Sequence, residues 1–273
     1  MLGRNRKYNM SEPNQINAMQ HILRLFSLTG SLGLLAVSMH AQVGLTAGGY
    51  AESFDGLGSG LPPGWSARTG ASASALGSPA TFDGAPYAWS STGGGFHNYA
   101  STDGLGAGAT AAQQAAASDR ALGVRPTGTS GDPGAAFVLQ VADTLGYQDF
   151  TVSWSFHLVD EEGRQGSWTL DYALGGNPAA FTSLHTFGRD TWGSQLESVA
   201  LPAAVNDQAQ PLWIRLAALT PTTGTGSRDS VAVDDFRLAY RPVAEVPEPG
   251  AWAMGVGLGL LGFAAWRRAA TRR

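Results

Sequence analysis

Four acidic residues near the two ends of the central segment have the chemistry needed to bind a hard cation. Glu52 and Asp55 lie in an expected opening strand, and Asp234 and Asp235 lie in an expected closing strand. Calcium takes several oxygen ligands, and carboxylates at neighbouring strand ends can supply them. The alternative is that these residues cap turns and strand edges. A structural calcium ion is therefore one hypothesis for this chain, although no loop has EF-hand spacing.

The densest acidic cluster is Asp160-Glu161-Glu162, which makes glycoside hydrolysis a second chemical hypothesis. Hydrolysis needs two carboxylates on either side of a sugar, about 5–10 Å apart. The cluster precedes Gly163-Arg164-Gln165-Gly166 between two expected strands, which predicts a hairpin loop. The Glu-x-Asp-x-x-Glu strand motif of laminarinase-type enzymes is absent from the sequence. We therefore expect a protein that is not an enzyme. A glycan-active hydrolase that uses Glu162 is the third hypothesis for function, after a surface or matrix protein and a carbohydrate-binding module.

Aromatic side chains suggest carbohydrate binding, because exposed rings with polar neighbours can form a sugar platform. The chain has eight tryptophans. Three occupy regular strand patterns and are expected in the core: Trp154, Trp168 and Trp213. Three lie in looser sequence and are the candidate sugar-binding residues: Trp65, Trp89 and Trp192. A carbohydrate-binding module is therefore the second hypothesis for function.

Other catalytic or metal-binding patterns are missing from the sequence. The chain has no cysteine, so it has no disulfide, no cysteine metal site and no cysteine nucleophile. His97, His157 and His185 are far apart and form no metal-binding pattern, and His157 is expected to be solvated on the polar face of a strand. No Gly-Xaa-Ser-Xaa-Gly elbow, P-loop or dinucleotide fingerprint occurs.

The charge is unevenly distributed along the chain. The formal net charge is −4, but residues 42–245 contain 19 acidic and nine basic residues, which is −10. Lys7 is the only lysine. An acidic central segment disfavours nucleic acid and anionic membranes as partners. It is typical of a soluble domain outside the cell or of one that holds cations.

Residues 48–240 show alternating apolar and polar positions between turn-forming residues, which predicts the strands of a β-sandwich domain covering residues 42–242. Val152, Trp154, Phe156 and Leu158 share one face of the clearest strand. Similar rows predict further strands at 50–54, 87–90, 121–125, 137–141, 168–174, 197–201, 212–216 and 230–240. Residues 56–81 and 101–119 are expected loops, the second with a short helix near 109–117. The pattern predicts an all-β, two-sheet jelly-roll-like sandwich.

The closing strand contains a change of phase. Apolar residues occupy odd positions before Asp234-Asp235 and even positions after it, which predicts a β-bulge there. Three segments, Ser53-Phe54-Asp55, the turn Leu61-Pro62-Pro63-Gly64-Trp65, and Val233-Asp234-Asp235-Phe236, together resemble concanavalin-like and MAM-like jelly rolls. First and last strands are often neighbours in such folds.

The N-terminus is typical of a secretory signal peptide. Residues 23–39 are mostly apolar, basic residues precede them, and small residues follow. We expect the signal peptide to cover residues 1–41, with cleavage after Ala41. Met19 begins a signal of ordinary length, so translation is expected to start there.

The C-terminus has three parts in order. Residues 243–250 form a Pro-rich linker, residues 251–266 an uncharged apolar segment expected to be a single transmembrane helix, and residues 267–273 a basic tail expected in the cytoplasm. The prolines keep the linker extended just outside the membrane, where an enzyme could bind it.

This tripartite ending resembles the PEP-CTERM sorting signal over residues 246–273. The resemblance implies that exosortase, a membrane-embedded transpeptidase, is a partner, with four recognition residues: Val246, Pro247, Glu248 and Pro249. It also implies an intermediate anchored in the inner membrane, then a final place at the cell surface or in an extracellular biofilm matrix. Exopolysaccharide is a further candidate partner.

Overall fold

The computed structural model describes residues 41–244 and eight residues of the C-terminal segment: Leu258, Leu260, Leu261, Phe263, Trp266, Arg267, Arg268 and Ala270. The predicted signal peptide, apart from Ala41, lies outside the described residues, as do the four predicted sorting residues and much of the segment 251–266. In the described part of the chain, no helix combines the length and hydrophobicity needed to cross a membrane.

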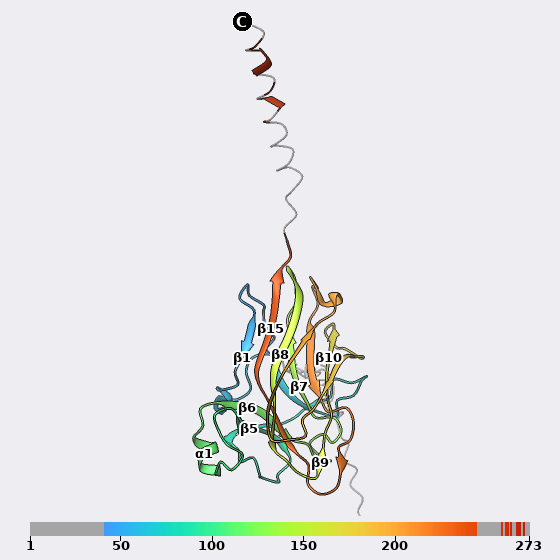
Figure 1. The fold of residues 1–273 in the computed structure, drawn as a ribbon. Helices are drawn as coiled ribbons and strands as arrows, with labels where there is room; N and C mark the ends of the chain where they lie inside the picture. The colour runs from blue at the N-terminus through green and yellow to red at the C-terminus, as the bar shows by residue number, and fades with distance from the viewer. Residues whose placement is uncertain are drawn as a thin grey trace, which may run out of the picture. The chain divides into compact units, whose positions relative to one another are not determined.

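Two large sheets form a sandwich-like arrangement (Figure 1). The seven-stranded sheet has the order β12 (Gly193–Ala200), β8 (Tyr147–Asp160), β15 (Ser230–Pro242), β6 (Arg120–Arg125), β5 (Gly95–Ala100) and β4 (Phe82–Pro86), and β1 (Tyr50–Glu52) also pairs with β15. The six-stranded sheet has the order β11 (Thr182–Phe187), β10 (Trp168–Leu174), β13 (Leu212–Ala217), β7 (Ala136–Val141), β2 (Trp65–Thr69) and β3 (Ser78–Pro79).

Small elements complete the domain: a two-stranded ribbon of β14 (Thr223–Gly224) and β9 (Arg164–Gln165), the short helices η1 (Leu57–Ser59) and η2 (Ala203–Val205), and α1 (Ala111–Ala116). The helix α1 lies inside the predicted range 109–117. Its first turn is closed by a capping box between Thr110 and Gln113. The predicted two-sheet arrangement is confirmed, and the described part of the chain is nearly all β.

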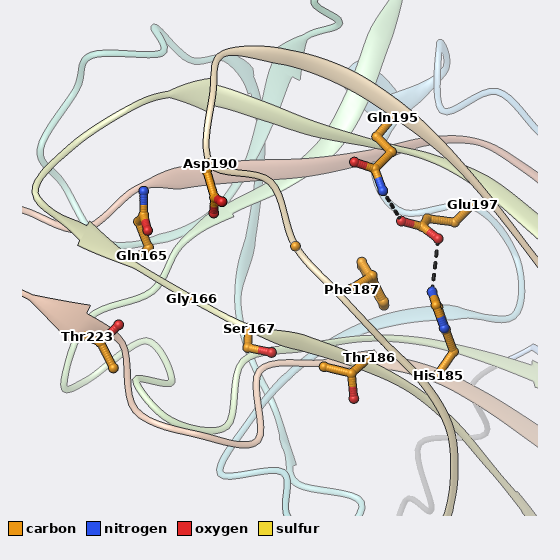
Figure 2. Close-up of a pocket in the computed structure, with 11 residues that line it drawn as sticks. Gln165, Gly166, Ser167, His185, Thr186, Phe187, Asp190, Gln195, Glu197 and Thr223 are labelled. Carbon is orange, nitrogen blue, oxygen red and sulfur yellow. Dashed lines mark hydrogen bonds and ion pairs between the residues drawn. The ribbon is translucent and has the colours of Figure 1, made fainter.

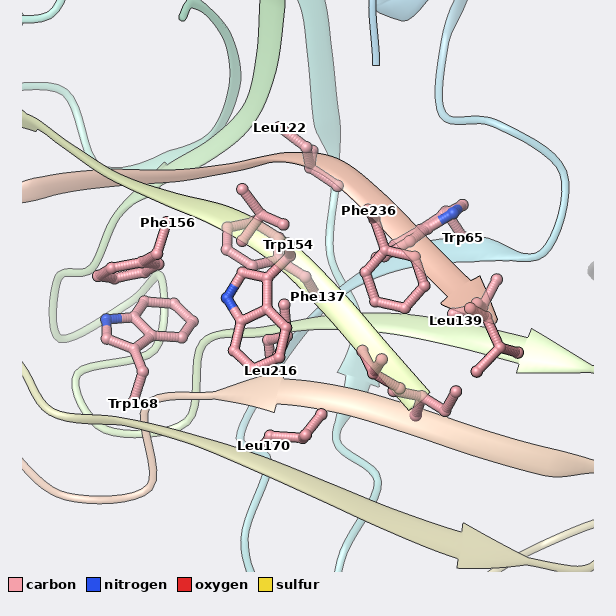
Figure 3. Close-up of a cluster of buried hydrophobic side chains, with 14 of the residues drawn as sticks. Trp65, Leu122, Phe137, Leu139, Trp154, Phe156, Trp168, Leu170, Leu216 and Phe236 are labelled. Carbon is pink, nitrogen blue, oxygen red and sulfur yellow. The ribbon is translucent and has the colours of Figure 1, made fainter. Parts of the chain in front are cut away.

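The core fills the space between the two large sheets (Figure 3). On β8, Val152, Trp154, Phe156 and Leu158 are at most 1% exposed, as their alternation predicted. Trp168 of the opposite sheet stacks on Phe137 with ring centroids 5.4 Å apart. Burial of large apolar side chains is the main favourable term in folding, so these rows hold the two sheets together.

The predicted bulge in β15 is confirmed. The register of β15 against β8 shifts between Asp234 and Arg237, and Asp235 has a φ of 47°. The opening strand β1 pairs with β15 directly after this bulge, with Glu52 opposite Phe236. First and last strands are therefore neighbours, as expected, and the bulge places two adjacent carboxylates beside the start of the domain.

Some strand predictions were wrong or missing. Residues 87–90 were predicted as a strand, but the strand β4 ends at Pro86. The strands β2, β5 and β11 were not predicted. All but the first residue of β5 are buried, because a loop covers its outer side, so Gly95–Ala100 shows no apolar–polar alternation.

The outer face of the six-stranded sheet is also covered. The loop between β2 and β3 runs across it, and Ala71, Val138 and Trp213 are buried in a second apolar cluster there. The guanidinium of Arg215 donates hydrogen bonds to the carbonyls of Ser72 and Ala75, at 2.9 and 2.7 Å. Segment 56–81, expected to be a long loop, instead contains η1, β2 and β3 and is part of the packed structure.

Candidate functional site

A polar cavity of about 530 Å³ opens where β11 and β12, the outermost strands of the two sheets, lie at the same edge of the sandwich (Figure 2). It is lined by residues of four segments: Gln165, Gly166, Ser167, His185, Thr186, Phe187, Gly188, Asp190, Gln195, Glu197 and Thr223. Most of these side chains carry a hydrogen-bonding group. The volume is in the range of pockets that bind small molecules, about 300–1,000 Å³.

A carboxylate held on both oxygens forms one wall of the cavity. Nε2 of His185 lies 3.0 Å from Oε2 of Glu197, and the amide of Gln195 donates to Oε1 of Glu197 at 2.6 Å (Figure 2). Gln195 and Glu197 pair with Phe156 and Trp154 of β8, so they share the inner side of the sheet. The edge strand therefore turns these two polar groups toward the opening between the sheets.

The base of the cavity is fixed to the core. Phe187 is 6% exposed and packs edge-on against Trp154 and Phe156, at 4.9 and 5.0 Å between ring centroids. The ring of His185 lies nearly parallel to that of Phe187. A rigid base of this kind orients His185 and Glu197 before any ligand arrives, which lowers the entropy cost of binding.

The opposite wall supplies further hydrogen-bonding groups. Gln165, Asp190 and Thr223 lie on that side, and Ser167 lies between Thr223 and Thr186 (Figure 2). Amides and hydroxyls both donate and accept, and carboxylates accept. Such a mixture matches a ligand with many hydroxyl groups, since each hydroxyl also donates and accepts. The general alternative is edge protection, because inward-pointing charges on edge strands also prevent unwanted strand pairing.

The predicted tryptophan platform does not form. Trp65 is 4% exposed and lies in the core, where it packs against Phe54 and Phe236. Trp89 is 3% exposed, and its indole N–H donates to the carbonyl of Ala100. Neither ring is available to stack on a sugar, because Trp65 faces the core from the start of β2 and Trp89 is covered by the segment that follows β5. Trp192 is half-buried against Trp89, 5.7 Å between ring centroids.

The predicted calcium ligands make separate contacts, although Asp119 lies within electrostatic reach of Asp55, Asp234 and Asp235. Glu52 and Asp235 line the same small cavity of about 210 Å³, whereas Asp234 is buried and hydrogen-bonds with Asp119. Asp55 accepts hydrogen bonds from the backbone of Arg120 and from Ser53. Across residues 41–244, no three or more His, Asp or Glu side chains are arranged to hold a metal ion. Calcium binding stays a prediction.

The acidic cluster at 160–162 is tied to a buried arginine. Asp160 forms an ion pair with Arg125, which is 2% exposed, and a carboxylate oxygen of Glu162 lies 4.0 Å from the same guanidinium. Glu161 accepts a hydrogen bond from the backbone of Trp192. Asp160 and Glu162 therefore compensate the charge of Arg125.

His157 is not solvated as predicted. It is fully buried, because the loop that follows β5 covers the outer face of the seven-stranded sheet, and its Nδ1 lies 2.8 Å from the hydroxyl of Thr102. Burial lowers the pKa of His157 to about 4, which keeps the ring neutral.

Comparison with known families identifies the C-terminal segment. Residues 245–269 match the PEP-CTERM protein-sorting motif, as the sequence predicted. The chain therefore carries a sorting signal, which implies that it is exported and processed at the cell envelope. No curated protein matches the chain.

Solved structures show only a distant likeness. The xylan-binding module CBM15 is 10% identical with a TM-score of 0.38, over 72% of this chain and 99% of that one. The CBM22-1 xylan-binding domain from Paenibacillus barcinonensis Xyn10C is 13% identical with a TM-score of 0.37, over 75% and 99%. The K1 cleaved adhesin domain of Lys-gingipain from Porphyromonas gingivalis W83 is 15% identical with a TM-score of 0.39, over 70% and 96%. Nothing about a ligand follows from these values.

Proposed function

We propose that this chain is a non-catalytic surface or matrix protein whose β-sandwich binds glycan in the cavity between β11 and β12. The observation that carries the proposal is the network of His185, Glu197 and Gln195 beside the buried ring of Phe187. It combines fixed hydrogen-bonding groups with an apolar base, which is how small-molecule sites orient polar ligands. A glycan-active hydrolase is the alternative, and the release of new reducing ends from the bound glycan would support it.

The sorting signal supports the location part of the proposal. After removal of the signal peptide, the segment 251–266 would hold the chain in the inner membrane, with the sandwich outside and the basic tail in the cytoplasm. Exosortase would then cut near Pro247-Glu248-Pro249 and release the sandwich to the cell surface or the matrix. Exopolysaccharide in that matrix would be the glycan within reach.

Glycan binding should weaken when the charge that holds His185 is removed. Glu197→Gln keeps the size of the side chain but replaces a charged acceptor, so we expect affinity to fall about tenfold, which is ~1.4 kcal/mol. The measurement is isothermal titration with oligosaccharides prepared from the exopolysaccharide of the native host. Ser198→Ala is the control, since Ser198 is exposed on the same strand but pairs with Ser153 on the other side of the sheet. Equal affinities for Glu197→Gln and the unmodified protein would exclude this cavity.

Processing should be visible in the intact mass of the protein from its native host. Cell-associated and extracellular fractions, measured separately, should both lack residues 1–41, and the extracellular fraction should also lack the segment after Pro249. Replacing Pro247 and Pro249 together by alanine should leave the protein in the cell-associated fraction, because the extended recognition segment is lost. Retention of Arg273 in every fraction of the unmodified protein would indicate a permanent membrane anchor.

A further inference from the structure

The geometry points to a second glycan-binding cleft at the opposite edge of the sandwich, so that one chain can hold two glycan strands at once. The inference rests on the proposed glycan binding at the first cavity. The strands β11 and β12 stand at one end of the two sheet orders, and β3 and β4 stand at the other end. A second cavity of about 400 Å³ lies at this other end.

The second cavity resembles the first in its chemistry. Its polar lining consists of four hydroxyl side chains, one carboxylate and one imidazole: Thr69, Thr81, Thr129, Ser130, Asp83 and His97. Phe96 lines it as well, and this ring is 2% exposed and packs edge-on against Phe137 of the core at 5.7 Å. Each edge of the sandwich therefore has a polar cavity beside a phenylalanine anchored in the core.

His97 is the residue of this cavity with the most hydrogen-bonding capacity left for a ligand. It is 8% exposed, and neither ring nitrogen forms a hydrogen bond of standard geometry with the described residues, although the backbones of Gly93 and Gly94 lie near enough to raise its pKa. Buried polar atoms in folded proteins are nearly always paired, so a weakly paired imidazole that lines a cavity has hydrogen-bonding capacity left for a ligand. The ring is fixed in place, because it stacks on Tyr87 with centroids 3.7 Å apart.

The neighbours of His97 define the class of ligand. Asp83 pairs with His97 across β4 and β5, so their side chains lie next to each other on one side of the sheet. Burial lowers the pKa of His97, and a neutral imidazole has one donor and one acceptor. A neutral ring, a carboxylate and several hydroxyls suit a sugar better than an anion, which Asp83 would repel. A single carboxylate and a single histidine are also too few ligands for a metal ion.

Gly94 allows the loop that carries Thr129 and Ser130 to pack closely against the start of β5, where it forms one wall of the second cavity. A Cβ at Gly94 would lie 2.4 Å from Cγ2 of Thr127 and 3.0 Å from Oγ of Ser130. Only glycine therefore allows the loop of Thr127–Ser130 to approach the start of β5 this closely. The loop keeps Thr129 exposed at the rim of the cavity.

Two sites on opposite edges would give the protein a cross-linking action. A chain that binds two separate polysaccharide strands connects them, and several such links on one strand act together through high effective concentration. This action needs no catalysis and suits a protein delivered to a polysaccharide matrix.

The test uses a bulky substitution in each cavity and a matched control. Thr129→Trp fills the second cavity, Gln195→Trp fills the first, and Ser198→Trp adds the same ring outside both; all three residues are exposed. Titration with oligosaccharides from the host exopolysaccharide should give two bound per chain for the unmodified protein and the control. Each cavity variant should give one, and the double variant none. Unchanged melting temperatures would show that the variants are folded.

Light scattering of the intact exopolysaccharide adds a second readout. The unmodified protein and Ser198→Trp should enlarge the scattering particles, whereas each cavity variant should bind without enlarging them. The second cleft would be overturned if the unmodified protein bound one oligosaccharide per chain, and if Gln195→Trp abolished this binding while Thr129→Trp and Asp83→Asn left it unchanged. The first cavity would then remain the binding site. No binding by any form would remove the proposed function itself, and the cross-linking role with it.

Discussion

Arg215→Met should lower the free energy of unfolding of the domain by about 3–5 kcal/mol, the usual cost of breaking a buried ion pair by removing one partner. The side chain of Arg215 is not exposed at all, and its guanidinium contacts both carboxylate oxygens of Asp171 at 2.6 and 2.8 Å. Asp171 is 1% exposed. Methionine matches much of the volume but leaves this carboxylate buried without a partner.

The same substitution should free the loop between β2 and β3. Arg215 donates to the carbonyls of Ser72 and Ala75 and lies over the ring of Phe181, 3.7 Å from its centroid. Losing these contacts removes part of the polar attachment of the loop, while the hydrogen bonds from Arg68 to Gly77 and from Ala71 to Gly134 remain. Hydrogen exchange of residues 70–77 should therefore speed up more than that of the strands beneath.

Urea denaturation followed by tryptophan fluorescence measures the first effect. Arg237→Met is the matched control, because Arg237 is exposed and should change stability by less than about 0.5 kcal/mol. Arg215→Met combined with Asp171→Leu should be more stable than Arg215→Met alone, since no charge then remains buried. If Arg215→Met resembled the Arg237 control, the ion pair would not stabilise the domain.

This example also shows why the fold was predictable while part of its detail was not. The inward rows of β8, β10 and β13 are apolar in every second position, and that pattern is enough to place two sheets around one core. Asp171 and Arg215 stand at the alternate positions, which normally face water. Their burial depends on a loop that arrives from residues 70–77, and no local pattern records such a contact.

The candidate site was missed for a related reason. Glu197 was recognised only as part of a strand, and His185 only as an isolated histidine. An acidic residue at an inward position of an edge strand, as Glu197 is beside Val199, is a signal that could have been read from the alternation. The sequence does not show that β11 and β12 end up at the same edge of two different sheets. The tryptophans in glycine-rich sequence were predicted to be exposed but are buried, because Trp65 begins a strand that faces the core and Trp89 is covered by the segment 101–119.

Stability should fall as pH rises from about 6.5 to 8, and Asp234→Asn should abolish most of that fall. Burial, followed by the nearby charges of Asp119 and Asp235, raises the pKa of Asp234 to about 8. A carboxyl whose pKa is higher in the folded state stabilises the protein while it is protonated, and this contribution is lost as pH rises toward the folded pKa. Asp234→Asn keeps a neutral side chain at every pH and should be the more stable form at pH 8.

The pH window follows from the other titrating groups near this site. Nε2 of His157 lies 4.0 Å from a carboxylate oxygen of Asp234. The pKa of His157 is about 4 in the folded state and near 6.5 in the unfolded state. Its contribution to the stability of the fold therefore increases as pH rises from 4 to 6.5. It therefore opposes Asp234 below pH 6.5. Burial raises the pKa of Asp229 to about 6, so its effect on the stability of the fold changes little above pH 6.5. Between 6.5 and 8 the Asp234 contribution should dominate.

Thermal unfolding at pH 6.5, 7.2 and 8 measures this effect, with Asp190→Asn as the control because Asp190 is exposed and lies outside the group of aspartates. Added calcium tests what relieves the repulsion within one group of carboxylates: Asp55, Asp103, Asp119, Asp234 and Asp235. Either a proton shared within the group or a bound cation would neutralise part of this charge. If millimolar calcium stabilises the unmodified protein at pH 8 but not Asp234→Asn, the predicted cation site exists and replaces the proton. If calcium changes neither form while the loss of stability with pH persists, the pair Asp119 and Asp234 acts through its proton alone. Equal pH dependence of Asp234→Asn and the unmodified protein would show that Asp234 is already ionised in the folded state.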